Sequence, residues 1–515
     1  MKWTTLLFLS ASGMAASGGL VWTAVQPDAS ASVAARSASP DPAADPGATP
    51  RRPRKPARPA ALDTERAHFQ AGSTLVMEGR LGHPVLPSTS DSQTYLFVEI
   101  GADGSQRAAV PAPLNLSIVM DRSGSMKGKR LANATAAARS AIQRLRDGDV
   151  VSLVAYNTAA EVLAPPTTID STSRARLLGS LGRLRAAGDT CISCGVDAGM
   201  RLLGQRAGMV GRVLLLSDGE ATAGVRDVEG FRRVAEDCRR MGASITTIGV
   251  DVDYNERIMA ALARDSNGRH FFVENPSGLA SIFDREMETL ASTVANNAEL
   301  TVDFAPGVFA EHVYDRSSAA SGSQVVVPLG AFAASDHKTV LVRLRVPRGS
   351  AGERPVAAVR LRFDDLTRGQ PGASEGALVA QLTDDESKVA PLDGLVSARL
   401  SSSETAEALE QANALFRAGQ SEAARKLVQD KAGVLNKRLD SARVTVASGR
   451  AGDLDDSFKR QTKALEQADT GFAQPPASAA PAADTPAAVA DERERDRKGK
   501  AQIRNNQKDA FDLAE

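Results

Sequence analysis

Short apolar runs alternate with amphipathic segments between residues 111 and 296. The apolar runs predict buried strands, and the first of them is LNLSIVMD at residues 114–121. The segments between the runs carry apolar side chains at helical spacing, as Leu131, Ala134 and Ala138 do. Apolar strands separated by amphipathic helices are typical of a parallel sheet covered on both faces. The pattern therefore predicts an α/β domain with a doubly wound, mostly parallel sheet.

A different pattern flanks this domain on both sides. Apolar and polar residues alternate over residues 66–110 and again over residues 297–395, which predicts strands with one buried face. We expect the two segments to join in an antiparallel β-sandwich. The α/β domain is then either inserted in this sandwich or followed by it.

Residues 396–470 change to helical spacing. Within them, AEALEQANALFRAGQSEAARKLVQ is similar to one tetratricopeptide-type hairpin. One such unit does not make a solenoid, so we expect a small helical cap on the sandwich, with a peptide-binding repeat as the alternative. Residues 471–515 are rich in Pro and Ala and then in charge, which predicts a disordered tail.

The N-terminal residues 1–36 have the features of a targeting segment. No charge occurs from Trp3 to Val25, and small residues follow, as in a signal peptide. The uncharged stretch is also long enough for a retained membrane anchor, and both interpretations place the protein in the periplasm, the cell envelope or outside the cell. Residues 37–65 form a Pro/Ala-rich basic linker, either simply solvated or held to an anionic surface.

Composition and motifs exclude several classes of function. The 515 residues include 62 Lys and Arg against 62 Asp and Glu, and only 4% are aromatic, which argues against nucleic acid as a partner. The five histidines are dispersed, and no nucleophile elbow, phosphate-binding loop, zinc-protease motif or dinucleotide fingerprint is present. A metal-dependent hydrolase would need a base beside the ion, for which Asp189 and Glu220 are the only candidates. We therefore expect a protein that is not an enzyme.

Oxygen-bearing side chains follow two of the predicted strands. DRSGSM places Asp121, Ser123 and Ser125 at the end of the first strand, and LLLSDG delivers Asp218 at the end of another. Ligands of such sheets bind at the carboxyl ends of the strands, where a Gly-bounded loop also offers Thr190. Two carboxylates and three hydroxyls, with no His or Cys among them, suit Mg²⁺ best, with Mn²⁺ or Ca²⁺ as alternatives. The simpler alternative is that Asp121 caps the following helix and the serines satisfy strand-end amides.

This set of residues resembles the metal-ion-dependent adhesion site of von Willebrand factor type A domains, over about residues 111–296. The resemblance implies direct metal coordination by Ser123, Ser125 and often Thr190, with Asp121 and Asp218 acting largely through water. It also implies that the ion accepts a carboxylate from a protein partner. One residue departs from the family pattern, because Asp189 stands where the family usually has Gly, and its carboxylate would tune the ion.

The order of the predicted domains loosely resembles that of bacterial surface A-domain proteins and, more distantly, of inter-alpha-trypsin inhibitor heavy chains. We therefore expect an exported adhesion or scaffold protein that binds an acidic residue of a protein partner through a divalent cation. The alternative is a structural component of an envelope assembly, in which the metal site is a folding element. A metal-dependent hydrolase is the minor alternative.

The cysteines divide into a pair and a single residue. Cys191 and Cys194 follow Thr190 at the start of a predicted helix, and an exported chain meets an oxidising compartment, so we expect a disulfide between them. The alternative is that both are small residues packing a loop. Cys238 completes an apolar helical stripe and is expected to be a buried free thiol.

Overall fold

A computed structural model describes residues 65–103, 111–206, 208–473 and 486–515. The expected signal peptide or anchor at residues 1–36, and all but the last residue of the expected linker, lie outside these ranges. Within the ranges, no helix combines the length and the apolar character that a membrane crossing requires.

A six-stranded sheet forms the centre of the segment between residues 111 and 296. The strand order is β10-β9-β8-β5-β6-β7, and every neighbouring pair is parallel except β6 and β7. Strands β5, β6 and β9 are buried along their whole length, which is why they appear in the sequence as nearly continuous apolar runs. The strands are β5 (Leu114–Asp121), β6 (Val150–Tyr156), β7 (Ala160–Thr168), β8 (Val210–Ser217), β9 (Ala243–Val250) and β10 (His270–Val273).

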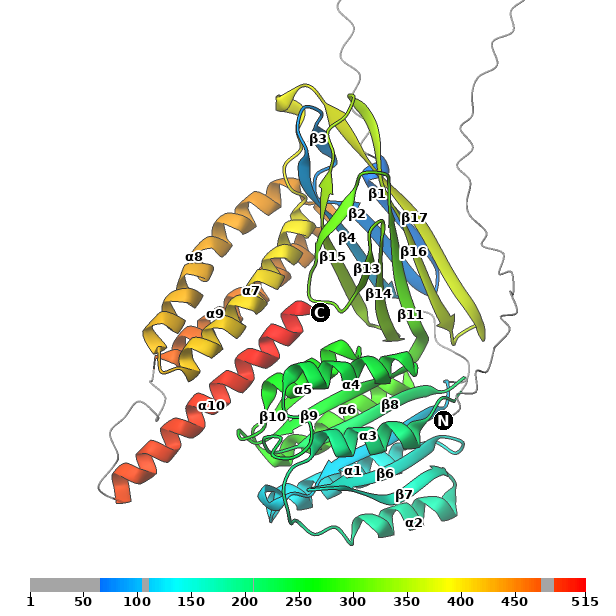
Figure 1. The fold of residues 1–515 in the computed structure, drawn as a ribbon, viewed down its shortest axis with the longest axis vertical. Helices are drawn as coiled ribbons and strands as arrows, with labels where there is room; N and C mark the ends of the chain where they lie inside the picture. Colours follow the sequence, from blue (N-terminus) through cyan, green and yellow to red (C-terminus); the bar gives the residue numbers. More distant parts are fainter. Residues whose placement is uncertain (1–64, 104–110, 207, 474–485) are drawn as a thin grey trace, which may run out of the picture. The chain divides into compact units, whose positions relative to one another are not determined.

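Helices cover both faces of this sheet (Figure 1). One core contains Ala138 of α1 and Phe283 of α6, and the core on the opposite face contains Val196 of α3 and Ile258 of α5. Successive residues of each strand point into opposite cores, as Leu214 and Leu215 of β8 do, so the domain has three layers. The helices are α1 (Lys129–Arg144), α2 (Ser171–Leu181), α3 (Ile192–Leu203), α4 (Val228–Arg240), α5 (Glu256–Asp265) and α6 (Leu279–Ala291).

Two further sheets enclose a separate core and form the sandwich. Their orders are β1-β2-β4-β15-β12 and β13-β14-β11-β16-β17-β3. Because β4 pairs with β15, strands from before and after the α/β domain share one sheet, and the domain is an insertion in the sandwich. All described pairs in the two sheets are antiparallel except β17 with β3. The strands are β1 (His68–Gly72), β2 (Leu75–Leu81), β3 (Val85–Pro87), β4 (Ser92–Ala102), β11 (Thr293–Phe304), β12 (Phe309–Val313), β13 (Ala319–Ser321), β14 (Gln324–Ala333), β15 (His337–Val346), β16 (Gly352–Asp365) and β17 (Gln370–Thr383).

The C-terminal region contains four long helices among its described residues. They are α7 (Gly394–Arg417), α8 (Ser421–Thr445), α9 (Ala451–Phe472) and α10 (Pro486–Ala514). The prediction of a disordered tail over residues 471–515 is therefore wrong for α10. This helix buries Ile503, Ala510 and Phe511, and the apolar surface so removed from water offsets the entropy lost on ordering. The predicted fold class, an α/β domain with a sandwich and a helical region, is confirmed.

His270 is a buried histidine at the start of β10. Its Nδ1 lies 2.9 Å from the Thr247 hydroxyl, and its Nε2 lies 3.4 Å from the Tyr254 hydroxyl. Burial, with a smaller contribution from the cationic side chains of Lys508 and Arg264, lowers the pKa of His270 to about 3. The folded protein therefore holds this ring neutral down to a pH at which an unfolded chain has already protonated it.

We expect this histidine to make the fold acid-sensitive. Between its unfolded pKa near 6.5 and about 3, the unfolded state binds the extra proton, so stability is full above pH 6.5 and falls as the pH drops. The loss from pH 7 to pH 5.5 is about 1 kcal/mol, measurable by urea unfolding. His270→Gln should be less stable at pH 7 but should lose less stability on acidification. An equal loss in both proteins would contradict the assignment.

Candidate metal centre

Strand β5 ends at Asp121 and delivers the DRSGSM segment to the carboxyl edge of the sheet. Asp121 is fully buried and Ser123 is 1% exposed, whereas Ser125 is exposed. The backbone N–H of Ser123 donates to Asp121 Oδ1 at 2.7 Å, which turns the chain back over the strand end. A short 3₁₀ turn, Gly124–Met126, follows, and the Gly124 N–H donates to the Gly188 carbonyl at 3.0 Å. The turn thus ties this segment to the loop that precedes Thr190.

The predicted oxygen donors lie close together. The hydroxyls of Ser123 and Ser125 are 3.0 Å apart, and the Ser125 hydroxyl donates to Asp218 Oδ1 at 2.7 Å. Asp218 directly follows β8, the neighbour of β5, so two adjacent parallel strands supply the two carboxylates. The alternative in which Asp121 caps a following helix does not describe this geometry, because α1 begins at Lys129 with Gly128 as its N-cap residue.

Thr190 reaches the same place from the loop before α3. A Cβ atom built on Gly219 would lie 3.5 Å from both Ser125 Oγ and Thr190 Oγ1, so both hydroxyls border the space that this glycine leaves open. The Thr190 N–H donates to the Thr222 hydroxyl at 2.9 Å, and its carbonyl accepts from Thr222 N–H at 3.0 Å. The structure therefore brings all five predicted donors together.

Burial makes the two carboxylates of this cluster weaker acids than exposed aspartates. It raises the pKa of Asp121 to about 6, although hydrogen bonds from Ser123 and from the Ser217 hydroxyl, 2.8 Å away, oppose the shift. It also raises the pKa of Asp218, against the hydrogen bond from Ser125 and the attraction of Arg130. No basic side chain of the described residues pairs with Asp121. A bound cation would supply the missing positive charge.

Arg130 and Ser217 belong to the cluster although sequence reasoning did not select them. Arg130 Nη1 lies 3.0 Å from Asp218 Oδ2, and the same guanidinium donates to Asp251, which directly follows β9. The Ser217 hydroxyl donates to the second oxygen of Asp121. The basic KGKR segment after the motif is the only sequence signal for Arg130. The direction in which the Arg130 side chain points depends on where α1 begins, which the sequence pattern does not determine.

The remaining predicted residues lie at the margin of the cluster. Asp189 is exposed, and its backbone N–H donates to the Thr158 hydroxyl at 3.1 Å. Cys191 and Cys194 form a disulfide with their Cα atoms 5.3 Å apart, at the start of α3. Cys238 is a buried free thiol, and burial raises its pKa to about 12. The disulfide directly follows Thr190 and thus bounds the loop that presents its hydroxyl.

The donor set fits a hard divalent cation. Carboxylate and hydroxyl oxygens are the ligands that Mg²⁺ and Mn²⁺ accept in proteins. No group of three or more His, Cys, Asp or Glu side chains suited to a metal occurs in the part of the chain that the structure describes, so a thiolate- or imidazole-rich centre finds no support there. Ser123, Ser125 and Thr190 would hold the ion, with Asp121 and Asp218 balancing its charge.

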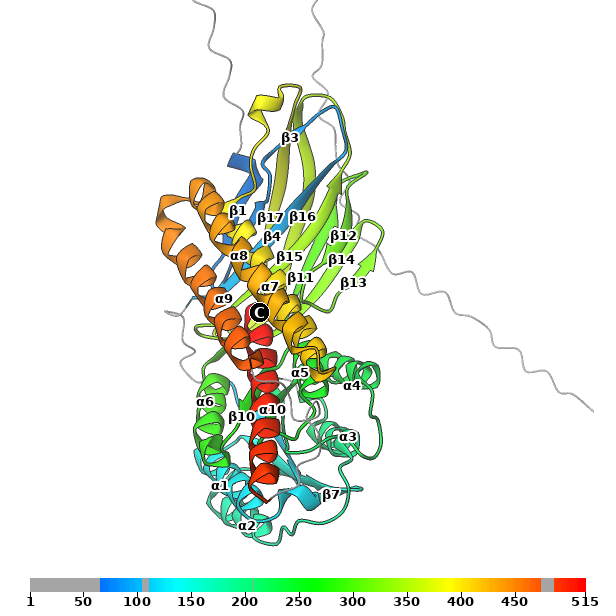
Figure 2. The ribbon, with the colours of Figure 1, turned by 90° about the vertical axis from the view of Figure 1, so that its left-hand side faces the viewer.

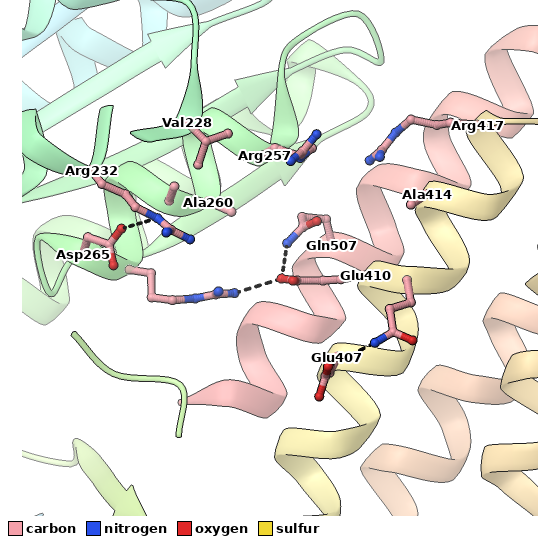
Figure 3. Close-up of a pocket in the computed structure, with 13 residues that line it drawn as sticks. Val228, Arg232, Arg257, Ala260, Asp265, Glu407, Glu410, Ala414, Arg417 and Gln507 are labelled. Carbon is pink, nitrogen blue, oxygen red and sulfur yellow. Dashed lines mark hydrogen bonds and ion pairs between the residues drawn. The ribbon is translucent and has the colours of Figure 1, made fainter. Parts of the chain in front are cut away.

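Cavities also occur elsewhere among the described residues. One of about 450 Å³ opens between α4 and α5 on one side and α7 and α10 on the other (Figure 3). Its wall is a set of ion pairs, such as Arg264 with Glu410 at 3.2 Å and Arg232 with Asp265 at 3.5 Å. None of the five oxygen donors lines it. The chemistry gathered at the sheet edge is open to the surface through Ser125.

Comparison with known families identifies the type of the α/β domain. Residues 115–285 match the model of the von Willebrand factor type A domain family. A solved structure described as a von Willebrand factor type A from Catenulispora acidiphila superimposes with a TM-score of 0.61 at 20% identity, covering 78% of this chain and 92% of that one. At this identity the likeness shows a shared fold, and it extends well beyond the matched domain.

Two curated proteins are related in sequence. The uncharacterized protein sll0103 of Synechocystis sp. is 26% identical over 294 residues, which are 55% of this chain and 68% of that protein. Inter-alpha-trypsin inhibitor heavy chain H4 of Homo sapiens is 23% identical over 231 residues, 40% of this chain but only 25% of the heavy chain. The second relationship agrees with the looser resemblance to inter-alpha-trypsin inhibitor heavy chains seen in the sequence.

Proposed function

Because residues 115–285 form a von Willebrand factor type A domain, we propose that this chain is an exported adhesion or scaffold protein that binds a carboxylate of a protein partner through a divalent cation, Mg²⁺ in the first place. Domains of this type commonly mediate protein–protein interactions and often bind a divalent metal. The proposal places both activities at the carboxyl edge of the sheet.

The observation that carries this proposal is the convergence of neutral hydroxyls at that edge. Ser123 and Ser125 lie 3.0 Å apart, and Thr190 borders the same space. Hydroxyl ligands leave most of the charge on an ion, so the ion can attract one further anionic ligand from outside. Ser125 is the exposed member of the group, and it marks the side from which a partner carboxylate would approach. A binding role needs no catalytic base, and we propose none.

A second role is favoured by the buried charge of Asp121. Burial raises its pKa to about 6, so a cation that stabilises the carboxylate also stabilises the fold. In this alternative the chain is a structural component of an envelope assembly, and the metal is a folding element. The two roles differ in what chelation does: it releases the partner in the first, and it only lowers the melting temperature in the second.

We expect metal-dependent capture of a partner from envelope extract. Immobilised chain should retain the partner in Mg²⁺ and release it in EDTA, and Ser125→Ala should retain at least tenfold less. Ser281→Ala is the matched control, because Ser281 is an exposed serine on α6 that bonds only locally, to the Gly278 carbonyl. Retention that is unaffected by EDTA or by Ser125→Ala would overturn the adhesion role. A lower melting temperature with retention intact would favour the folding role.

A further inference from the structure

A chain of ion pairs runs from the candidate metal centre to the C-terminal helix α10. Arg130 Nη1 lies 3.0 Å from Asp218 Oδ2, and Arg130 Nε lies 3.0 Å from Asp251 Oδ2. The other oxygen of Asp251 accepts from Arg497 Nη1 of α10 at 2.9 Å. Two arginines therefore share Asp251, and one of them also holds a carboxylate of the metal centre.

Two further cationic residues of α10 hold the loop between β9 and α5. Lys500 Nζ lies 3.2 Å from Asp253 Oδ1. Arg504 pairs with the buried Glu256 at 2.7 Å and donates to the Tyr254 carbonyl at 2.6 Å. Figure 2 shows α10 running beside β10 and α5. Arg497, Lys500 and Arg504, spaced about one helical turn apart on α10, thus pair with successive acidic residues of this segment.

The two halves of α10 are held in different ways. From residue 492 to residue 500 every side chain is at least partly exposed, and the contacts to the loop are ionic. The C-terminal half buries Ile503 and Phe511, and Gln507 donates to Glu410 of α7 at 3.0 Å, as Figure 3 shows. Arg497 and Lys500 are 48% and 39% exposed, and ion pairs of exposed side chains are weak and screened by salt, although Asp251 itself is buried. The N-terminal half is therefore held more weakly than the C-terminal half.

We propose that residues 492–500 of α10 are a latch whose docking opposes cation binding at the metal centre. This inference rests on the proposed metal site. When Asp218 turns its charge toward a divalent cation, the Arg130 guanidinium loses part of its partner and is repelled by the like charge. Arg130 then relies on Asp251 and on Asp253, 3.7 Å away. It competes there with Arg497 and Lys500, so the latch loosens.

Thermodynamic linkage makes this coupling reciprocal. If the cation weakens latch docking, latch docking weakens cation binding by the same factor. A loosened latch also deprives the exposed Asp253 of its Lys500 partner, while Arg130 keeps Asp251. A partner that presents a carboxylate next to a Lys or Arg would then match both features, as α10 itself does with Asp496 and Lys500.

Hydrogen exchange on the full chain tests the latch, with Mn²⁺ alone as the probe. We expect saturating Mn²⁺ to speed amide exchange in residues 492–500 several-fold, while residues 501–514 keep their rate and serve as the internal control. In the Arg130→Ala variant, Mn²⁺ should no longer change the exchange of residues 492–500, because the connection to Asp251 is gone.

Calorimetric Mn²⁺ titration tests the reciprocal effect. The double variant Arg497→Asp/Lys500→Asp should bind Mn²⁺ about fivefold more tightly than wild type. Arg493→Asp, one turn earlier on the same exposed face, reports the effect of removing charge at a distance. Unchanged exchange in a chain that binds Mn²⁺ would overturn the latch and leave the proposed function standing. An affinity gain no larger than twice that of Arg493→Asp, which reverses one charge where the double variant reverses two, would do the same. A wild-type chain that binds no Mn²⁺ would overturn both.

Discussion

The Asp121→Ala variant is expected to bind Mg²⁺ or Mn²⁺ at least 100-fold more weakly than the wild-type chain. Asp121 is fully buried, and both of its oxygens are positioned by hydrogen bonds from Ser123 N–H and the Ser217 hydroxyl. Its charge is the part of the donor set that no basic side chain of the described residues compensates. Without it, a divalent cation would be left with neutral hydroxyls and with Asp218, which Arg130 already neutralises in part.

Isothermal titration calorimetry measures this loss directly, and Asp218→Ala should behave in the same way. Asp147→Ala is a suitable control, because Asp147 is an exposed carboxylate of the same domain, paired with Arg174 at 3.2 Å. We expect Asp121→Ala to remain folded, since it removes a buried charge together with hydrogen bonds worth only about 1 kcal/mol each. Unchanged Mg²⁺ or Mn²⁺ affinity in both Asp121→Ala and Asp218→Ala would place the ion elsewhere.

The candidate site could be predicted because its chemistry is local in the sequence. A strand that ends at Asp121 must deliver Ser123 and Ser125 to the same edge, and β8 delivers Asp218 beside them because it is parallel to β5. The position of Arg130 was not predictable in this way. Its guanidinium reaches Asp218 and Asp251 only because α1 starts at Lys129 and points it back over the strand ends.

The elements that the sequence did not predict depend on distant contacts. β7 contains Pro165 and Pro166, which disfavour an interior strand, but it lies at the edge of the sheet and pairs only with β6. The composition of α10 suggested disorder, yet its charges meet partners about 250 residues away, as Arg497 does with Asp251. The charged residues of α10 and the proline pair of β7 do not by themselves indicate which other part of the chain packs against them.

The helical repeat shows how far periodicity alone can be trusted. In the second helix of the hairpin the sequence offers two apolar pairs at helical spacing, Ala423 with Leu427 and Ala424 with Val428, and only the second pair is buried. The helix begins at Ser421 after Gly419, whose φ of 77° ends the preceding helix. The turn fixes the rotation of the helix, and a shift of one residue moves the buried face. The helical spacing of the apolar residues can be seen in the sequence, whereas the choice of which pair is buried depends on the turn.

Gly195→Ala is expected to destabilise the protein by about 1 to 3 kcal/mol, the usual cost of an overpacked core. Gly195 lies in α3, where a Cβ atom would come within 2.5 Å of Tyr156 Cδ1 and 3.0 Å of Val119 Cγ1. The Tyr156 ring cannot turn aside easily, because it is fully buried and its hydroxyl donates to the Leu216 carbonyl at 3.0 Å. Helix α3 must therefore move away from β5 and β6.

That movement should also weaken the metal centre, because Thr190 precedes α3 and is carried by it. We expect Gly195→Ala to lose both unfolding free energy, measured in urea, and Mn²⁺ affinity, measured by calorimetry. Gly179→Ala is the matched control: Gly179 is exposed on α2, a Cβ there meets nothing within 4 Å, and helix propensity should add about 0.5 to 1 kcal/mol of stability. If Gly195→Ala were as stable as wild type, α3 could not be packed against β5 at this distance. If it lost stability but kept its Mn²⁺ affinity, Thr190 would not be a ligand that depends on the seating of α3.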